Sequence, residues 1–324
     1  MSDLISADAK SDLEHFRIRH LLAHGCVKAR AALLDLSEVK SCDIQMCIRD
    51  SVKATDVFVI GGGPAGLAAA VAARQRGLAV VVADGARPPI DKPCGEGLMP
   101  DGRTALAELG IEVPPDSSHP LRGVRFVGGG LNADANFPGR LGLGIRRTVL
   151  HRIMVENAEA AGVTLLWHTP VTGINSQGVL LGERMVRSRW VVGADGGHSL
   201  VRRWAGLDRH ISNRTRFAFR RHYRIRPWSD FMEIHWGPKC QIYVTPIAED
   251  EICVALVSHD PHLRLEFAMS AFPEIASRLR LSLIHIFTQE PFSYEDRRAG
   301  YPPQIKDMPP EESGSFRKSG LHPH

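Results

Sequence analysis

Three closely spaced glycines have the type and spacing to let backbone bind a pyrophosphate. Gly61, Gly63 and Gly66 form a G-x-G-x-x-G pattern in which Gly62, Pro64 and Ala65 fill the three variable positions. The first glycine allows a tight turn, the second lets backbone approach the phosphates, and the third lets a helix pack closely on a strand. Amides at the helix N-terminus then face the phosphates. The pattern predicts a bound dinucleotide, although turns with this spacing also occur in loops that bind nothing.

The neighbouring segments supply the elements that such a turn needs. Residues 56–60 form a short apolar run with β-branched side chains, typical of a parallel strand buried on both faces. We expect a helix from Pro64 to about Arg76 and a second buried strand over residues 78–83. Asp84 ends that strand, close to the spacing of about 20 residues at which an acidic residue binds the adenosine ribose. This context favours a nucleotide-binding α/β unit over an empty turn.

Composition excludes several classes of protein. The chain has 324 residues, of which 44% are hydrophobic and 23% charged, typical of a soluble protein of about two domains. A formal charge of +4 and dispersed arginines argue against a nucleic-acid partner. Arginines interrupt the longest apolar region, residues 65–83, so we expect no transmembrane segment and a cytoplasmic location. Six cysteines without a C-x-x-C pair indicate reduced thiols, not disulfides or a metal site.

A loop rich in glycine, DKPCGEGLMPDG over residues 91–102, follows the second expected strand. A helix is expected from about Arg103 to Leu109. Gly95 and Gly97 would let backbone approach a flat ring. Cys94 is a candidate for contact with such a ring or with a substrate. The alternative is a plain turn cysteine, because no neighbouring base indicates an activated thiolate.

A second glycine-containing turn follows another apolar strand, residues 190–192, and leads into a helix. Its sequence, G-A-D-G, ends in Asp195 and Gly196. A carboxylate at the carboxyl end of a buried strand can accept hydrogen bonds from ribityl hydroxyls, and a glycine lets the chain pass close to a cofactor. The alternative role for Asp195 is to cap the following helix.

Residues 54–280 resemble the flavoprotein family that includes geranylgeranyl reductases, flavin-dependent halogenases and aromatic hydroxylases of the para-hydroxybenzoate hydroxylase type. The resemblance rests on the two glycine turns and on a K-x-C-G-x-G-L segment found in the reductase branch. That segment is matched by Lys92, Cys94, Gly95, Gly97 and Leu98, with Glu96 at its variable position. The resemblance implies FAD as the cofactor, with this loop beside the flavin and Asp195 on the ribityl chain.

The resemblance also implies a role for an arginine before a helix. Arg147 best matches the position that reaches the ribityl chain or the pyrophosphate, and Arg146 is the competing neighbour. A surface arginine is the alternative. We expect no metal ligands, and we assign no catalytic residue beyond Cys94 as a candidate near the flavin.

The expected fold class is α/β: a Rossmann-type FAD-binding domain with a parallel sheet, interleaved with a mainly antiparallel substrate domain. The FAD-binding domain is expected over residues 53–120 and 145–205, and the substrate domain over residues 121–144 and 206–280. A hairpin through Gly128–Gly130 and four strand-like runs supply the second sheet. The runs are residues 214–226, 230–236, 239–246 and 251–258. Aromatic side chains on these runs line a pocket or belong to the core, and His222 and His235 are weak acid–base candidates.

The resemblance implies an FAD-dependent oxidoreductase. It would reduce a double bond of a small hydrophobic or aromatic substrate, or hydroxylate it, with NAD(P)H or another reductant. The K-P-C-G-E-G-L segment favours reduction, and hydroxylation is the close competitor. Halogenation is disfavoured because no W-x-W-x-I-P segment occurs. A nicotinamide-only dehydrogenase does not require Asp195 in its G-A-D-G setting.

Two segments resemble translations of a transposon mosaic-end adapter. Residues 46–50, MCIRD, match the codons ATG TGT ATA AGA GAC, and residues 281–286, LSLIHI, match the reverse complement. We therefore expect residues 1–52 and 281–324 to be foreign to the core, and the latter to be disordered. The family's third motif, G-D-A, would be missing. The alternative function is therefore a non-catalytic nucleotide-binding fragment from a chimeric, truncated reading frame.

Overall fold

The computed structural model describes residues 52–208 and 216–280. Apart from Val52, the flanking segments expected to be foreign lie outside these residues, so their origin and expected disorder stay predictions. The described chain forms two six-stranded sheets and one small sheet.

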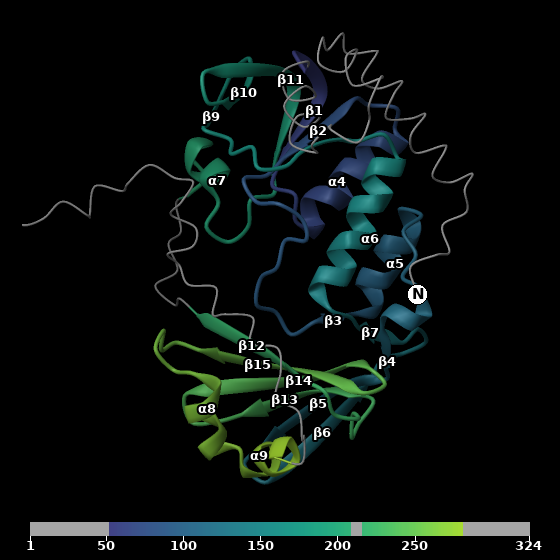
Figure 1. The fold of residues 1–324 in the computed structure, drawn as a ribbon, viewed down its shortest axis with the longest axis vertical. Coiled ribbons are helices and arrows are strands. Elements are labelled where there is room, and N and C mark those ends of the chain that lie inside the picture. The colour runs from purple at the N-terminus through teal and green to yellow at the C-terminus, as the bar shows by residue number, and fades with distance from the viewer. Residues whose placement is uncertain (1–51, 209–215, 281–324) are drawn as a thin grey trace, which may run out of the picture. The chain divides into compact units, whose positions relative to one another are not determined.

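The first sheet is mostly parallel and includes the strand before the glycine turn. Its strand order is β8-β2-β1-β11-β10-β9 (Figure 1). Strands β8, β2, β1 and β11 pair in parallel, and β10 and β9 continue the sheet in antiparallel pairing. The bounds are β1 Ala54–Ile60, β2 Val80–Ala83, β8 Thr164–Leu166, β9 Gly173–Asn175, β10 Gly178–Leu181 and β11 Arg184–Gly193.

Strand β1 is buried on both faces, as its apolar run predicts. Val57 and Val59 pack into the cluster formed with the helices on one face. Phe58 and Ile60 pack into a different cluster on the other face. This division follows from the alternation of side chains along a strand. A central parallel strand therefore accounts for the lack of polar alternation.

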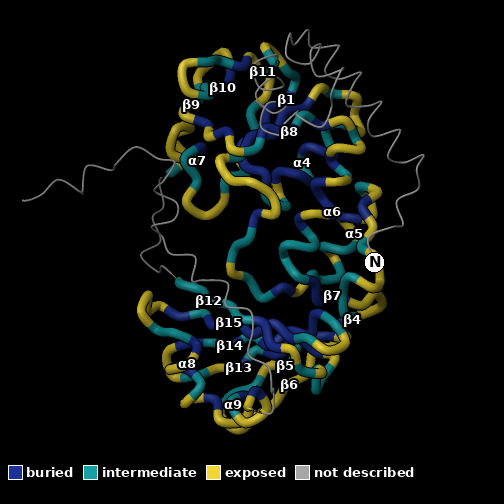
Figure 2. The backbone as a smooth tube through the Cα atoms, in the orientation of Figure 1, coloured by how far each residue is buried: buried dark blue, intermediate teal, exposed yellow. Residues whose placement is uncertain are grey.

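Helices α4 Pro64–Gln75 and α6 Arg147–Ala160 cover one face of this sheet. Leu67 of α4 and Met154 of α6 are fully buried there. Figure 2 shows buried backbone in α4 and in the strands beside it. Pro64 occupies the first turn of α4, where its missing N–H removes no helical hydrogen bond. Further helices of this part are α5 Pro100–Glu108, the 3-10 turn Pro115–Ser117 and α7 Leu200–Trp204.

The second sheet is mainly antiparallel, with strand order β12-β15-β14-β13-β5-β6. Strands β5 and β6 form the predicted hairpin, and the parallel pairing of β5 with β13 joins it to the later strands. The bounds are β5 Gly123–Gly128, β6 Leu131–Asn136, β12 Phe217–Tyr223, β13 Phe231–Trp236, β14 Cys240–Ala248 and β15 Glu251–Ser258. The four predicted strand-like runs are confirmed.

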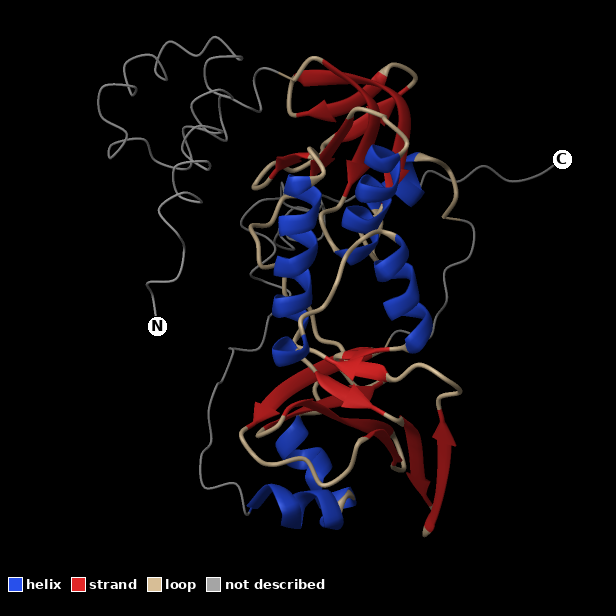
Figure 3. Ribbon diagram, turned by 90° about the vertical axis from the view of Figure 1, so that its right-hand side faces the viewer, coloured by secondary structure: helices blue, strands red, loops and turns tan. Residues whose placement is uncertain are grey.

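Short helices cover one face of the second sheet, as Figure 3 shows. They are α8 Leu265–Ala268, the 3-10 turn Met269–Ala271 and α9 Pro273–Arg280. Ile275 and Leu279 of α9 are buried in one cluster with Tyr223, and Phe219 packs against that cluster. These two aromatic side chains of β12 therefore belong to the core.

A small sheet of order β3-β7-β4 includes part of the glycine-rich loop. Its strands are β3 Gly97–Leu98, β4 His119–Leu121 and β7 Gly142–Gly144. A Cβ on Gly144 would lie 1.6 Å from the carbonyl oxygen of Pro246, so glycine is required for β7 to pass this close to β14.

These sheets confirm the expected fold class, an α/β protein with a Rossmann-type parallel sheet and a mainly antiparallel second sheet. The helix after the glycine-rich loop begins at Pro100, earlier than expected. The residue ranges assigned to the two domains stay a prediction. None of the helices between residues 52 and 280 that the structure describes is long and apolar enough to cross a membrane.

Candidate cofactor-binding site

The two glycine turns lie side by side at the carboxyl ends of β1 and β11. Ile60 pairs with Gly193, and the Ala194 amide donates to the Ile60 carbonyl oxygen at 2.7 Å. Gly61 has a φ of +110°, and a Cβ there would lie 2.4 Å from the Ala194 carbonyl oxygen. Only glycine allows the two turns to approach this closely.

The other two glycines of the first turn have different surroundings. A Cβ on Gly66 would lie 1.9 Å from the Gly61 carbonyl oxygen, so this glycine lets α4 pack on the turn. A Cβ on Gly63 would have no described atom within 4 Å. No side chain among the described residues caps the N-terminus of α4. The turn therefore has open space at Gly63, beside the N-terminus of α4. A phosphate site needs such space next to helix amides.

Asp84 is tied to the first turn from the end of β2. Its Oδ2 accepts from the Gly62 amide at 2.8 Å, and its Oδ1 accepts from the Ala86 amide at 2.8 Å. A carboxylate has about four lone-pair positions, so acceptor capacity remains for a ribose hydroxyl.

One buried and one half-buried side chain that the sequence did not indicate also hold this turn. His151 of α6 is fully buried, and its Nε2 lies 2.8 Å from the Gly62 carbonyl oxygen. Its Nδ1 accepts from the Ile90 amide at 3.3 Å, so Nε2 carries the proton and donates to Gly62. The ring of Trp167 would lie 2.3 Å from a Cβ on Gly62. Burial is the main cause that lowers the pKa of His151, which favours the neutral ring.

The glycine-rich loop meets the second turn and the second sheet. The Nζ of Lys92 lies 3.3 Å from where a Cβ of Gly196 would stand, so two predicted motifs come together here. A Cβ on Gly97 would lie 2.8 Å from the Met232 sulfur, and one on Gly95 would lie 3.6 Å from the Tyr243 ring. Gly97 therefore allows close packing against the second sheet, whereas a Cβ on Gly95 would make an ordinary van der Waals contact.

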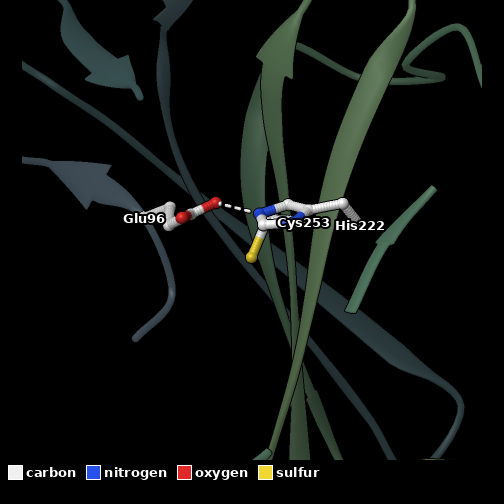
Figure 4. Close-up of side chains that lie close together, drawn as sticks. All are labelled: Glu96, His222 and Cys253. Carbon is white, nitrogen blue, oxygen red and sulfur yellow. Dashed lines mark hydrogen bonds and ion pairs between the residues drawn. The ribbon is translucent and has the colours of Figure 1, made fainter. Parts of the chain in front are cut away.

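Glu96, at the variable position of the loop, is the centre of a buried polar cluster. Its Oε1 accepts from the Arg147 amide and from Nη1 of Arg220, both at 2.8 Å. Its Oε2 accepts from Nε2 of His222 at 2.7 Å (Figure 4). Burial raises the pKa of Glu96, but the His222 hydrogen bond, the Arg220 charge and the Arg147 amide together lower it below its usual value. The carboxylate is therefore ionised.

Arg220 extends this cluster to the start of the loop. Its Nη2 donates to Oδ2 of Asp91 at 2.6 Å. The thiol of Cys253 lies beside the cluster and makes a 3.8 Å contact with the Cys94 carbonyl oxygen. Burial raises the pKa of Cys253 well above its usual value, so the thiol is neutral. Cys94 is a free, half-buried thiol in the loop.

The two neighbouring arginines have different roles. Arg146 forms a two-nitrogen ion pair with Glu251 at the start of β15, with Nε donating at 3.0 Å. The Nε of Arg147 is buried and has no hydrogen-bond partner within residues 52–208 and 216–280. Arg146 therefore joins α6 to the second sheet. The Nε–H of Arg147, in contrast, is available to a ligand.

Asp195 caps the short helix α7. Its Oδ2 accepts from the amides of Leu200 and Val201 at 2.6 and 3.1 Å, and its Oδ1 accepts from the Ser199 hydroxyl at 2.5 Å. The capping alternative is therefore present in the structure. One acceptor position remains for a cofactor hydroxyl, so the ribityl contact stays a prediction.

The second histidine candidate belongs to a separate cluster in the second sheet. The Nε2 of His235 lies 3.0 Å from Oε2 of Glu233, which also accepts from Nε1 of Trp228 at 3.1 Å. Arg125 reaches the other oxygen of Glu233 at 3.4 Å. In the described parts of the chain, the hydrogen bonds of this cluster stay within the second sheet and the Trp228 segment and do not reach the glycine turns. His222, not His235, lies beside the glycine-rich loop.

The residues present fit FAD at three points. The open position at Gly63 would accommodate a pyrophosphate, the spare donor of Arg147 would bind an anionic or hydroxyl oxygen, and Asp84 would accept from the ribose. Pro64 and Ala65 form the first turn of α4, directly after Gly63.

Two curated proteins are similar to about half of the chain. Over 175 residues it is 33% identical to menaquinone reductase of Mycobacterium tuberculosis, covering 49% of this chain and 42% of the relative. Over 173 residues it is 35% identical to digeranylgeranylglycerophospholipid reductase 1 of Methanothermobacter thermautotrophicus, covering 48% of this chain and 43% of the relative. The chain thus spans less than half the length of these relatives.

A solved structure and a family model agree with this similarity. The solved structure is a probable FAD-dependent monooxygenase from Pseudomonas aeruginosa, with a TM-score of 0.55 and 22% identity over 63% of this chain and 60% of that chain. At this identity the match shows the shared fold. The model of the FAD binding domain matches residues 54–245. The chain therefore belongs to the FAD binding domain family.

Proposed function

We propose that this protein is an FAD-dependent oxidoreductase that reduces a double bond of a small hydrophobic substrate. Two features carry the binding of FAD: a Cβ on Gly63 would meet no described atom, and the buried Nε of Arg147 has no hydrogen-bond partner among the described residues. Arg147 begins the helix from which His151 reaches Gly62. When bound, FAD would supply the hydride or electrons for the reduction. The chain itself would bind the cofactor and orient it.

Each contact residue would have a distinct role in holding the cofactor. Backbone of Gly61, Gly63 and Gly66 would receive the pyrophosphate, and Asp84 the adenosine ribose. Arg147 would bind the ribityl chain or the pyrophosphate, and Asp195 a ribityl hydroxyl. Gly196 would let backbone pass close to the cofactor, with Lys92 beside it. Cys94, Gly95 and Gly97 would lie at the flavin ring.

The names of the curated relatives support reduction over hydroxylation, since both are reductases. The K-P-C-G-E-G-L loop supports the same choice. Hydroxylation stays the competing activity because the monooxygenase has the same fold. NAD(P)H is proposed as one possible reductant. The cytoplasmic location stays a prediction from the sequence.

Product mass separates these activities. The full chain, loaded with FAD, would be incubated with NADPH or dithionite and with either a menaquinone or a geranylgeranyl lipid. We expect the product to gain two hydrogen atoms that remain after any quinol has been reoxidised in air, because reduction of a quinone ring to its quinol also adds two. A product that gains one oxygen atom, in the presence of air, would instead support hydroxylation. Tight flavin binding without either product from several polyprenyl and aromatic substrates would support the non-catalytic fragment.

A further inference from the structure

The buried carboxylate of Glu96 is unusual for a glycine-rich loop. Glu96 is 5% exposed, and its φ of +55° lies in the left-handed region that favours glycine. Burying a carboxylate is unfavourable unless charged or polar partners compensate. A left-handed backbone at a residue with a side chain is also unfavourable. The side chain must therefore make contacts that offset both effects.

Those contacts join three separate parts of the chain. The loop is tied to the N-terminus of α6 by the Arg147 amide, which donates to Oε1, and by the Ile145 amide, which donates to the Glu96 carbonyl oxygen at 2.9 Å. It is tied to β12 of the second sheet by Arg220 and His222. Glu96 thus lies where the glycine-rich loop, the Arg147 helix and the second sheet meet.

A metal ion is a competing interpretation of this cluster. Glu96, His222 and Cys253 offer oxygen, nitrogen and sulfur ligands that all lie within 4.8 Å of one another (Figure 4). However, both carboxylate oxygens already accept hydrogen bonds, and the Arg220 guanidinium is 2.8 Å from one of them. A cation would have to replace the hydrogen bond between His222 and Glu96 and approach a fixed positive charge. The contacts therefore favour a closed ion-pair cluster.

We propose that Glu96 is a positioning residue for the flavin site: its charged carboxylate fastens the glycine-rich loop and Arg147 to strand β12. This inference rests on the proposed binding of FAD. It goes beyond the family motif, in which the Glu96 position is variable. Loss of the carboxylate would let the loop and Arg147 move relative to the first glycine turn, and the cofactor would then bind less tightly.

The variant Glu96→Gln removes the charge and keeps the shape. Its amide oxygen could still accept from the Arg147 amide and Arg220. Its amide nitrogen would donate to Nε2 of His222, which can become an acceptor by carrying its proton on Nδ1. We therefore expect this variant to fold. Glu96→Ala removes every contact of this carboxylate, while Arg220 keeps its hydrogen bond to Asp91.

Glu233→Gln is a matched control. Glu233 is also 5% exposed, and it too accepts from a histidine, here His235, and from an arginine, here Arg125. Its cluster lies between strands of the second sheet and makes no contact with the glycine-rich loop among the residues described. Both substitutions should lower stability, but only the one at Glu96 should affect the cofactor.

The test is FAD titration of the flavin-free full chain, with the potential of the bound flavin as a second readout. We expect Glu96→Gln to weaken FAD binding about tenfold, and Glu96→Ala to weaken it further. The glutamine variant should therefore retain part of the FAD affinity that the alanine variant loses. Glu96→Gln also removes a negative charge near the flavin, so the reduction potential of the bound flavin should rise. Glu233→Gln should leave affinity and potential at the wild-type values.

Three results would overturn the proposal. Wild-type affinity and potential in Glu96→Gln would show that the carboxylate does not position the site, with FAD binding itself intact. An equal loss in Glu233→Gln would show a general loss of stability. A stoichiometric metal in the purified chain, removed by Glu96→Gln, would establish a metal site instead. A wild-type chain that binds no FAD would contradict the proposed function as well.

Discussion

The Nε2 of His151 donates to the carbonyl oxygen of Gly62 at 2.8 Å and so fixes the middle of the first glycine turn from helix α6. The other ring nitrogen accepts from the Ile90 amide, which connects the turn to the loop after β2. Four residues before His151, the same helix begins with Arg147. One helix therefore positions both the turn and the arginine proposed to bind the cofactor.

Replacing His151 with phenylalanine should destabilise the protein. The ring would fit a similar space, but the Gly62 carbonyl and the Ile90 amide would lose their partners in a buried region. We expect a loss of about 2 kcal/mol in the free energy of unfolding. Urea unfolding of the His151→Phe and wild-type chains measures it. A loss below about 0.5 kcal/mol, typical of surface substitutions, would mean that these hydrogen bonds contribute little.

The lowered pKa of His151 predicts how stability depends on pH. Burial keeps the folded ring neutral below its usual pKa of 6.5, whereas the unfolded chain takes up a proton there. The contribution of neutral His151 is therefore fully present above about pH 6.5 and is lost as pH falls toward the folded-state pKa, at up to about 1.4 kcal/mol per pH unit. Urea unfolding from pH 7.5 to 5 would show this slope. His151→Phe should have a shallower slope, and an unchanged slope would contradict the assignment.

Two glycine substitutions should separate binding from folding. Gly63 has a φ of −72°, which any residue can adopt, and a Cβ there meets no described atom. Gly63→Val should therefore fold but bind FAD at least about a hundredfold more weakly, because the side chain occupies the pyrophosphate position. Gly66→Ala should instead unfold or misfold, because its Cβ would lie 1.9 Å from the Gly61 carbonyl oxygen. FAD titration and circular dichroism distinguish the two, and undiminished FAD affinity in Gly63→Val would contradict the site.

The adjacent arginines provide a second matched pair. Arg147→Ala should weaken FAD binding about tenfold or more while changing stability little, because its Nε has no partner among the described residues. Arg146→Ala should lower the free energy of unfolding by about 1 kcal/mol, through loss of the partly buried ion pair with Glu251, and leave FAD affinity nearly unchanged. The opposite pattern would assign the cofactor contact to Arg146.

Local sequence patterns predicted the elements of the fold well. The apolar run of β1, the glycine turn and the proline at the start of α4 each act over a few neighbouring residues, so the sequence specifies them directly. The hairpin of β5 and β6 follows from the glycines between two alternating runs. The parallel pairing of β5 with β13 joins strands that are distant in the chain, and no local pattern indicated it.

The buried polar contacts of the site were harder to predict, because they depend on which distant residues meet. Glu96 occupied a variable position of a motif, yet it accepts from Arg147, Arg220 and His222. His151 resembled any polar residue of an amphipathic helix. The acidic residue inside a glycine-rich loop was the one available signal for Glu96, since such a carboxylate needs partners. The structure shows the alternative role of Asp195, because its carboxylate accepts from the first amides of α7.

Flavin occupancy tests the central claim most directly. The full chain would be purified, stripped of any bound cofactor and titrated with FAD while the flavin absorbance and fluorescence are followed. The account predicts saturable binding of one FAD per chain, abolished by Gly63→Val in a folded variant. A correctly folded wild-type chain that binds no FAD, or one that binds a nicotinamide dinucleotide tightly in its place, would contradict it.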